Sequence, residues 1–260
     1  MDLETVLRTV IEPPIGWLVV DRPDARGAMT RDMWLAVPEK LAQLAAHPDV
    51  RVVVVRGSQG YFIAGADITE FQHYRSDPEL ARIYDEGSQA TLEALERLAV
   101  PSIAMIDGPC VGGGSLIAFG CDLRVIADRG FMAIPAGRLG LAYPHHGLER
   151  LVAVLGEAKA LDLLLTGRRI AGPESLSLGM TQRCFPHADL ETETRTLCDQ
   201  IAKMAPLSLR YSRLAARRKL SGILGDDEIH EMIGACFASD DYKEGVTAFL
   251  EKRSPKFKGS

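Results

Sequence analysis

Apolar residues along the chain follow two different spacings, which together predict an α/β fold. Short β-branched runs at residues 16–20 and 50–55 are bounded by Pro, Gly and Asp, as expected of strands. The second run is so uniformly apolar that both of its faces should be covered. Residues 33–46, which lie between the two runs, repeat apolar side chains at helical spacing. The chain is therefore expected to open with a strand, a helix and a strand.

The next part of the chain continues this alternation of helix and strand. Residues 76–98 predict a helix, because Asp77 and Pro78 form a typical helix start and Pro101 ends the pattern. The elements expected after it are a strand at 102–106, a helix at 115–121 and a strand at 123–127.

Strand signals become sparse after about Leu148, and helical periodicity dominates the remaining sequence. The expected helical segments are 148–165, 173–178, 190–204, 208–220, 227–237 and 242–252. We therefore predict an α/β core over residues 1–200 and a helical C-terminal region over residues 201–260.

Composition and charge exclude several classes of function. The chain has 260 residues, of which 47% are hydrophobic and 25% charged, which is enough to bury a core. A formal net charge of −5 gives no general attraction to nucleic acid, so we expect no nucleic-acid partner. No apolar run approaches the roughly 20 residues of a membrane span, and residues 1–12 do not resemble a signal peptide, so we expect a cytoplasmic protein without a membrane partner. The five cysteines show no metal-ligand spacing and are expected to be buried thiols.

Two glycine turns are the first candidates for chemistry. Residues 107–114 place a turn and a helix start after a strand, and this arrangement leaves backbone N–H groups that no side chain shields. Residues 62–68 form a second turn of this kind. Two such N–H groups that converge on one thioester carbonyl would form an oxyanion hole. The G-x-G-x-x-G spacing of a dinucleotide-binding turn fails at Ile117, which disfavours a nicotinamide-dependent reductase.

These turns belong to a larger resemblance. Residues 65–67, 107–114 and 121–122 closely resemble motifs of the crotonase (enoyl-CoA hydratase/isomerase) superfamily, in the same order and at similar separations. The resemblance extends from residues 21–29, which look like a CoA-binding turn, to the tail at 236–253. It implies a crotonase-like (ββα)n spiral core with a helical C-terminal trimerisation region. It also implies a homotrimer or hexamer that acts on acyl-CoA, with no cofactor besides the coenzyme A of the substrate.

The resemblance also assigns site residues. It implies that the N–H groups of Ala66 and Gly113 form the oxyanion hole. The residues that it places at the bound acyl-CoA are Arg22, Ala25, Arg26, Ala64, Ile68, Leu116, Pro135 and Ala136, with Phe249 and Lys252 reaching the CoA of a neighbouring subunit. Arginine and lysine suit the phosphates of CoA. Thr69 stands where the family often has a lysine.

The resemblance fails at the two positions that carry hydratase chemistry. A typical hydratase of this family has glutamates at the positions aligned with Leu116 and Ala136, and together they hold and activate water. General acid or base catalysis typically contributes about 10²- to 10⁴-fold per group, so ordinary hydration should be strongly impaired. The carboxylates within matched motifs, Asp67 and Asp122, are expected to stabilise turns through backbone N–H groups.

The loop at residues 138–150 offers substitutes for the missing glutamates. His145 or His146 are the best candidate acid/base groups, because histidine titrates near neutral pH, with Tyr143 and Glu149 as donating or orienting groups. The alternative is that this polar loop is solvated or forms a subunit contact. Two adjacent histidines without a third ligand do not predict a metal site.

Two classes of function stay open from the sequence. The first is an enzyme that polarises an acyl-CoA thioester and completes hydration, isomerisation, decarboxylation or hydrolysis with a group other than glutamate. The second is a catalytically silent acyl-CoA-binding or assembly subunit, which Leu116 and Ala136 would suit. The acyl pocket is expected from the helix 76–98 and the loop 139–147.

Overall fold

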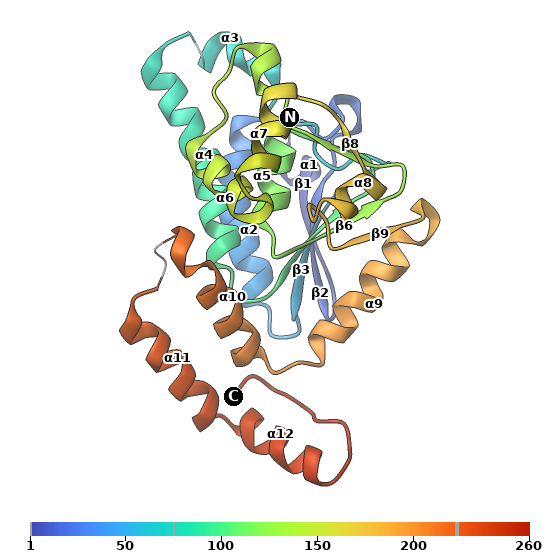
Figure 1. Ribbon diagram of the computed structural model, residues 1–260, viewed down its shortest axis with the longest axis vertical. Helices are drawn as coiled ribbons and strands as arrows, with labels where there is room; N and C mark the ends of the chain where they lie inside the picture. The colour runs from blue at the N-terminus through green and yellow to red at the C-terminus, as the bar shows by residue number, and fades with distance from the viewer. Residues whose placement is uncertain (1, 75, 222–223) are drawn as a thin grey trace.

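A six-stranded sheet forms the centre of the computed structural model, which describes residues 2–74, 76–221 and 224–260 (Figure 1). Its strands, in sheet order, are β1 (Leu7–Glu12), β2 (Ile15–Val20), β3 (Val52–Gly57), β4 (Ser102–Ile106), β6 (Leu123–Ala127) and β9 (Arg183–Phe185). Strand β1 is antiparallel to β2, and every other neighbouring pair is parallel. Parallel strands need crossover connections, and here helices supply most of them.

Helices cover both faces of this sheet (Figure 1). The helices on one face are α2 (Arg31–Ala46), α4 (Pro78–Arg97), α5 (Gly113–Gly120), α6 (His145–Leu155) and α7 (Glu157–Thr166), and the opposite face packs on α9 (Leu190–Ala202). Because successive strand residues point to opposite faces, Val53 and Val55 join the first core whereas Val52 and Val54 face α9. The predicted coverage of both faces of this strand is confirmed.

Helix starts follow the predicted capping chemistry. The Asp77 side chain accepts hydrogen bonds from the N–H groups of Glu79 at 2.8 Å and Leu80 at 3.2 Å, and Pro78 occupies the first position of α4. Where one helix was predicted over 148–165, Gly156 adopts φ +77° and separates α6 from α7. A single uninterrupted helix in this region is therefore wrong.

A second, three-stranded sheet leads into the glycine turn. Its strands are β5 (Pro109–Val111), β7 (Phe131–Ala133) and β8 (Ile170–Ala171). Strand β5 ends beside Gly112, whose N–H donates to the Ala133 carbonyl at 2.9 Å. The remaining short helices are α1 (Leu3–Val6), α3 (Phe71–Tyr74) and α8 (Gly172–Ser177). This small sheet fixes the part of the turn at residues 107–114 that leads into α5.

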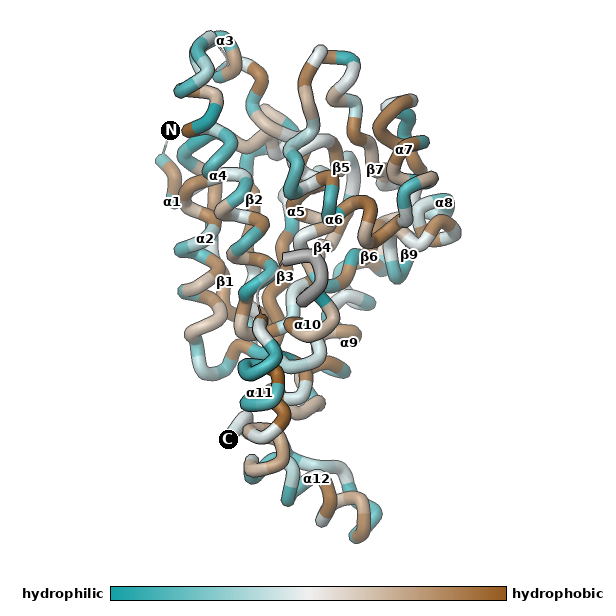
Figure 2. Tube along the Cα trace, turned by 60° about the vertical axis from the view of Figure 1, so that its left-hand side comes forward, coloured by the Kyte–Doolittle hydropathy of each residue, from teal (hydrophilic) through white to brown (hydrophobic). Residues whose placement is uncertain are grey.

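The C-terminal region begins with α10 (Pro206–Ser221), which a buried ion cluster holds against the core. Asp122 lies 2.6 Å from Arg213 Nε and 2.8 Å from an Nη of Arg217, and it accepts the Ser102 N–H at 2.7 Å. The last contact confirms the predicted role of Asp122 in holding a backbone N–H. Helices α11 (Asp226–Ala238) and α12 (Asp240–Leu250) then project beyond the sheet and its covering helices (Figures 1 and 2).

The predicted α/β architecture with a helical C-terminal part is confirmed in outline. The strands at 102–106 and 123–127 have the predicted bounds. Strand β1, which no sequence signal predicted, precedes the expected first strand and forms the edge of the sheet. Among the described residues, no helix combines the length and the apolar character needed to cross a bilayer.

Candidate active site

Two backbone turns bring the main-chain amides of Ala66 and Gly113 together. Gly65 has φ +116° and Gly112 has φ +53°, conformations that favour glycine, and each residue directly precedes one of the two amides. A Cβ placed on Gly113 would lie 3.4 Å from the Ala66 nitrogen, and one placed on Gly65 would lie 3.7 Å from the Gly113 nitrogen. The two turns predicted from the sequence are therefore neighbours in space.

Neither of these two amides is used by the surrounding backbone. The Met29 N–H donates to the Gly65 carbonyl and the Met29 carbonyl accepts from the Asp67 N–H, both at 2.8 Å, which fixes the residues on either side of Ala66. Gly113 is the first residue of α5, where an N–H has no acceptor within the helix. Within the described residues, no hydrogen bond takes the N–H of Ala66 or Gly113.

Segment 60–63, which leads into the first turn, is enclosed by glycines from three other parts of the chain. A Cβ placed on Gly27, Gly108 or Gly114 would lie 2.6, 2.1 or 2.0 Å, respectively, from a carbonyl oxygen of this segment. Such approaches are too close for any real side chain, because packed carbon and oxygen atoms stay above 3 Å. The backbone before Ala66 is thus held in place by glycines.

A cavity of about 190 Å³ opens beside the two amides. The predicted site residues that line it are Ala64, Ala66, Ile68, Gly113, Leu116, Pro135, Ala136 and Tyr143. Most of its other walls are apolar, with Phe71, Leu139 and Leu141 among them. A mostly apolar hollow next to a pair of backbone donors suits an acyl chain that ends in a carbonyl group.

Tyr143 places a buried hydroxyl group at this cavity. A Cβ placed on Gly147 would lie 2.6 Å from Leu116 Cδ1 and 3.0 Å from Tyr143 Cε1, so the tyrosine ring and Leu116 meet across Gly147. The hydroxyl oxygen has no hydrogen-bond partner among the described residues. Burial raises the pKa of Tyr143, so the group stays protonated at neutral pH and acts as a donor.

The two histidines proposed from the sequence begin α6 but do not line the cavity. The His145 side chain is 82% exposed, and its Nε2 lies 3.4 Å from Glu149 Oε1. His146 is half-buried in a separate depression with acidic residues of α4, and burial lowers its pKa. The physical reason is the helix itself: Gly147 faces Leu116, and consecutive helical residues point in different directions. This placement argues against the acid/base role that we assigned to the histidines.

The Arg22 side chain forms an ion pair and a hydrogen bond with other residues of the chain. Its Nη1 lies 2.6 Å from Asp67 Oδ2 and donates to the Ala28 carbonyl at 2.9 Å. Asp67 also accepts the Thr69 N–H at 3.0 Å, which confirms its predicted role in a turn. Arg22 therefore joins the turn at residues 21–29 to the turn that presents Ala66.

The neighbouring residues of this turn, Ala25 and Arg26, do not line the cavity. Arg26 is exposed, with φ +53°, and its carbonyl accepts the Ala64 N–H at 3.2 Å. Ala25 directly precedes it in the same turn. The exposed guanidinium thus lies outside the cavity, on the segment bonded to its rim.

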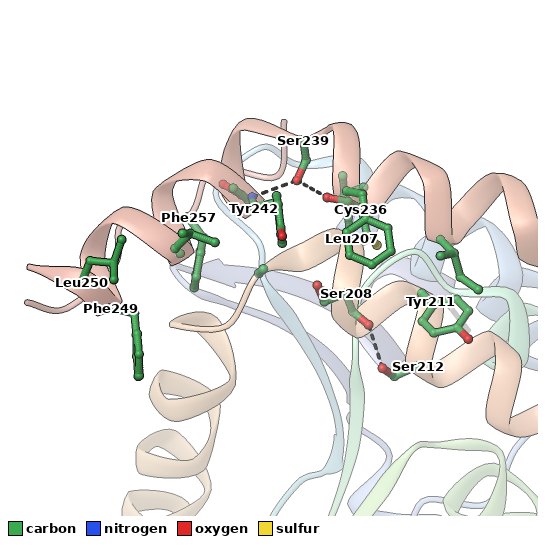
Figure 3. Close-up of a pocket in the computed structure, with 16 residues that line it drawn as sticks. Leu207, Ser208, Tyr211, Ser212, Cys236, Ser239, Tyr242, Phe249, Leu250 and Phe257 are labelled. Atoms are coloured by element: carbon green, nitrogen blue, oxygen red, sulfur yellow. Dashed lines mark hydrogen bonds between the residues drawn. The ribbon is translucent and has the colours of Figure 1, made fainter. Parts of the chain in front are cut away.

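A larger hollow, of about 590 Å³, lies apart from the amides, between α10, α11 and α12 (Figure 3). Its lining is mainly apolar and includes Tyr211, Phe257 and the exposed side chains of Phe249 and Leu250 on α12. Lys252 follows that helix, with φ +55°. Phe249 and Lys252, for which the resemblance predicts contacts with a neighbouring subunit, therefore lie in the projecting C-terminal part. No group of three His, Cys, Asp or Glu side chains among the described residues is arranged to hold a metal ion.

Trp34 and Asp85 are cavity residues that the sequence reasoning did not name individually, although it placed the helix 76–98, which carries Asp85, at the acyl pocket. Trp34, which is 1% exposed, lies on α2, and Asp85 lies on α4; both line the cavity. Asp85 directly follows Tyr84, which belongs to the apolar face of the predicted helix at 76–98. A carboxylate that borders an apolar helix face is the signal that could have identified it.

Comparison with known proteins identifies the family. The family model described as Enoyl-CoA hydratase/isomerase matches residues 12–260. The "Probable enoyl-CoA hydratase echA8" of Mycobacterium bovis is 32% identical over 259 residues, which cover 99% of this chain and 99% of that protein. The peroxisomal Delta(3,5)-Delta(2,4)-dienoyl-CoA isomerase of Arabidopsis thaliana is 29% identical, over 97% of this chain and 95% of its own.

A solved structure agrees with these matches. The crystal structure of an enoyl-CoA hydratase/isomerase family protein from Hyphomonas neptunium superposes with a TM-score of 0.92 at 34% identity, covering 99% of both chains. The crotonase-like fold predicted by the resemblance is thereby confirmed. The chain belongs to the enoyl-CoA hydratase/isomerase family.

Proposed function

We propose that the protein binds an acyl-CoA thioester with its carbonyl oxygen between the amides of Ala66 and Gly113, and that these amides stabilise the enolate formed from it. The observation that carries this proposal is the pair of neighbouring N–H groups, unused within the described chain, at the edge of an apolar cavity. One donor of this kind typically contributes about 10²- to 10³-fold to kcat, because it is already aligned with the charge that develops.

The cavity walls favour proton transfer over the addition of water. Leu116 and Ala136, which occupy the positions where the resemblance expects glutamates, line the cavity and offer no group to hold a water molecule. Tyr143 supplies a protonated hydroxyl group next to Leu116. We therefore expect an isomerase-type reaction, in which a proton and a double bond move within the acyl chain, and only weak hydration. The coenzyme A of the substrate is the only cofactor that this chemistry requires.

The proposed enzyme is a homotrimer or hexamer. The mainly apolar hollow of α10 to α12 would be covered by a second copy of the chain, in which Phe249 and Lys252 of one subunit approach the CoA bound by the next. Arg26 would contact phosphates from within the same subunit. Light scattering of the purified protein tests the assembly, and a monomer at micromolar concentration would contradict it.

The catalytic proposal is tested by two substitutions at one position. Gly113→Pro removes the N–H at a helix position that tolerates proline, but it also adds a Cβ 2.8 Å from Trp34 Cζ2. Gly113→Ala adds the same Cβ and keeps the N–H, so it is the matched control. With a panel of 2-enoyl- and 3-enoyl-CoA thioesters, kcat of the proline variant should be about 10²- to 10³-fold below that of the alanine variant.

The possible outcomes separate the two classes of function. Equal kcat for the proline and alanine variants contradicts the role of the Gly113 amide. Tight binding of acyl-CoA thioesters by calorimetry, without turnover of any member of the panel, would instead identify a silent acyl-CoA-binding subunit.

A further inference from the structure

The cavity lining includes an aspartate that the family resemblance does not assign. The titratable side chains among its described lining residues are Tyr84, Asp85 and Tyr143. Tyr143 remains protonated because burial raises its pKa. The Tyr84 ring packs edge-on against Phe71, with ring centroids 5.7 Å apart. Asp85 is thus the one described cavity residue with the chemistry of an anionic base.

Trp34 links the cavity wall that carries Asp85 to the Gly113 amide. A Cβ placed on Gly87, two residues beyond Asp85 on α4, would lie 3.1 Å from Trp34 Cβ. At the far end of the same Trp34 side chain, Cζ2 of the indole ring would lie 2.8 Å from a Cβ placed on Gly113. Thr91 Oγ1 donates to the Trp34 carbonyl at 3.0 Å, which fixes α4 against α2 at this level. One side chain therefore spans the distance between the helix that carries Asp85 and the Gly113 amide.

The second polar side chain of α4 at the cavity does not compete for this role. Ser88 Oγ donates to the main-chain carbonyl of Asp85 at 2.9 Å, so its proton is used within the helix. Leu116 and Ala136 also line the cavity, and neither side chain can accept a proton. Among the described cavity residues, the candidate for a base is therefore on α4.

We propose that Asp85 is the catalytic base that moves the proton at the α-carbon of the bound acyl-CoA, an inference that rests on the proposed function. The carboxylate takes a proton from the α-carbon, and the electron pair of that C–H bond shifts into the thioester, whose oxygen becomes the enolate held by the Ala66 and Gly113 amides. With a 3-enoyl-CoA the same proton then returns to the γ-carbon as the double bond moves to the α,β position. Asp85 ends as a carboxylate, and no water is consumed.

The test is exchange of the α-protons of butyryl-CoA in D₂O, followed by NMR and mass spectrometry. This exchange needs a base and an oxyanion hole, but no double bond and no second acid. Asp85→Asn should lower the exchange rate by about 10²-fold or more, while the dissociation constant for butyryl-CoA changes less than about threefold. Asp85→Glu keeps the carboxylate and should retain measurable exchange. Circular dichroism and butyryl-CoA binding show whether each variant is folded.

Glu86→Gln is the matched control, because Glu86 is the next residue of α4, is exposed and pairs with Arg82 rather than with the cavity. It should exchange at the wild-type rate. Wild-type exchange by the folded Asp85→Asn variant overturns the proposal for Asp85. If the wild type turns over the enoyl-CoA panel but exchanges no α-proton, Asp85 is also excluded as this base while the proposed function stands. A wild type that neither exchanges nor turns over any thioester refutes both.

Discussion

Removal of the Asp122 carboxylate is expected to detach α10 from the core. The side chains of Asp122, Arg213 and Arg217 are only 14%, 7% and 5% exposed, and the carboxylate lies within 2.8 Å of both guanidinium groups. Arg213 also donates to main-chain carbonyls at the end of α4, so it links α10 to that helix as well. Asp122→Ala removes the carboxylate that both of these buried guanidinium groups contact.

The magnitude follows from this burial. Breaking a buried ion pair by deleting one partner typically costs about 3 to 5 kcal/mol. Water can reach the partly exposed end of Asp122, so we expect the lower half of that range, about 3 to 4 kcal/mol. This is a large fraction of the roughly 5 to 15 kcal/mol that stabilises a folded protein.

Guanidinium unfolding followed by circular dichroism measures the loss, and hydrogen exchange of peptides locates it. Exchange should increase across α10 and remain slow in β3 and β4. The control is Asp162→Ala, which removes an exposed carboxylate paired with Arg168 and should leave the midpoint unchanged. An Asp122→Ala protein with the wild-type midpoint and wild-type protection of α10 would refute the reasoning.

Three further outcomes follow from particular contacts. Burial raises the pKa of Glu96, so its ionised form opposes folding: Glu96→Gln should raise the thermal midpoint at pH 7.5, and the gain should vanish below about pH 4, where the unfolded carboxyl is also protonated. Gly114→Ala forces a Cβ against the Ile63 carbonyl, so kcat on enoyl-CoA should fall by about 10²-fold as the two amides separate; an unchanged kcat contradicts this. Only two of the five thiols should react with Ellman's reagent in the native protein, and a third reacting thiol would be inconsistent with the fold. The three buried thiols are Cys110, Cys121 and Cys198.

Local sequence signals predicted the elements that depend on local chemistry. The strands at 102–106 and 123–127 are continuous apolar runs between turns, and they were found with their observed bounds. Strand β1 was missed because it mixes polar and apolar residues at the edge of the sheet, where one side is solvated. Strands β5, β7 and β8 span two or three residues, too few to show a periodicity.

The same distinction between local and non-local features applies to the candidate site. The two glycine turns could be predicted because each is encoded within a few residues, and the family resemblance then pointed to the amides of Ala66 and Gly113. Which side chains face the cavity could not be predicted, because this depends on where a helix begins. Helix α6 begins at His145, and this start turns Gly147 toward Leu116 and both histidines elsewhere. Asp85 was not named because its place at the cavity depends on how α4 packs against α2.

The glycines that enclose segment 60–63 have a consequence for how such an enzyme can evolve. The backbone frame that presents the Ala66 and Gly113 amides is secured by the absence of side chains at three distant positions, whereas the cavity walls on α4 and the loop 139–147 are built from ordinary side chains. Replacements in these walls can accumulate without displacing the frame. A saturation-mutagenesis library should therefore show its least tolerant positions at Gly27, Gly108 and Gly114, which carry no reactive group, and more tolerant ones along these walls, with Asp85 as the exception.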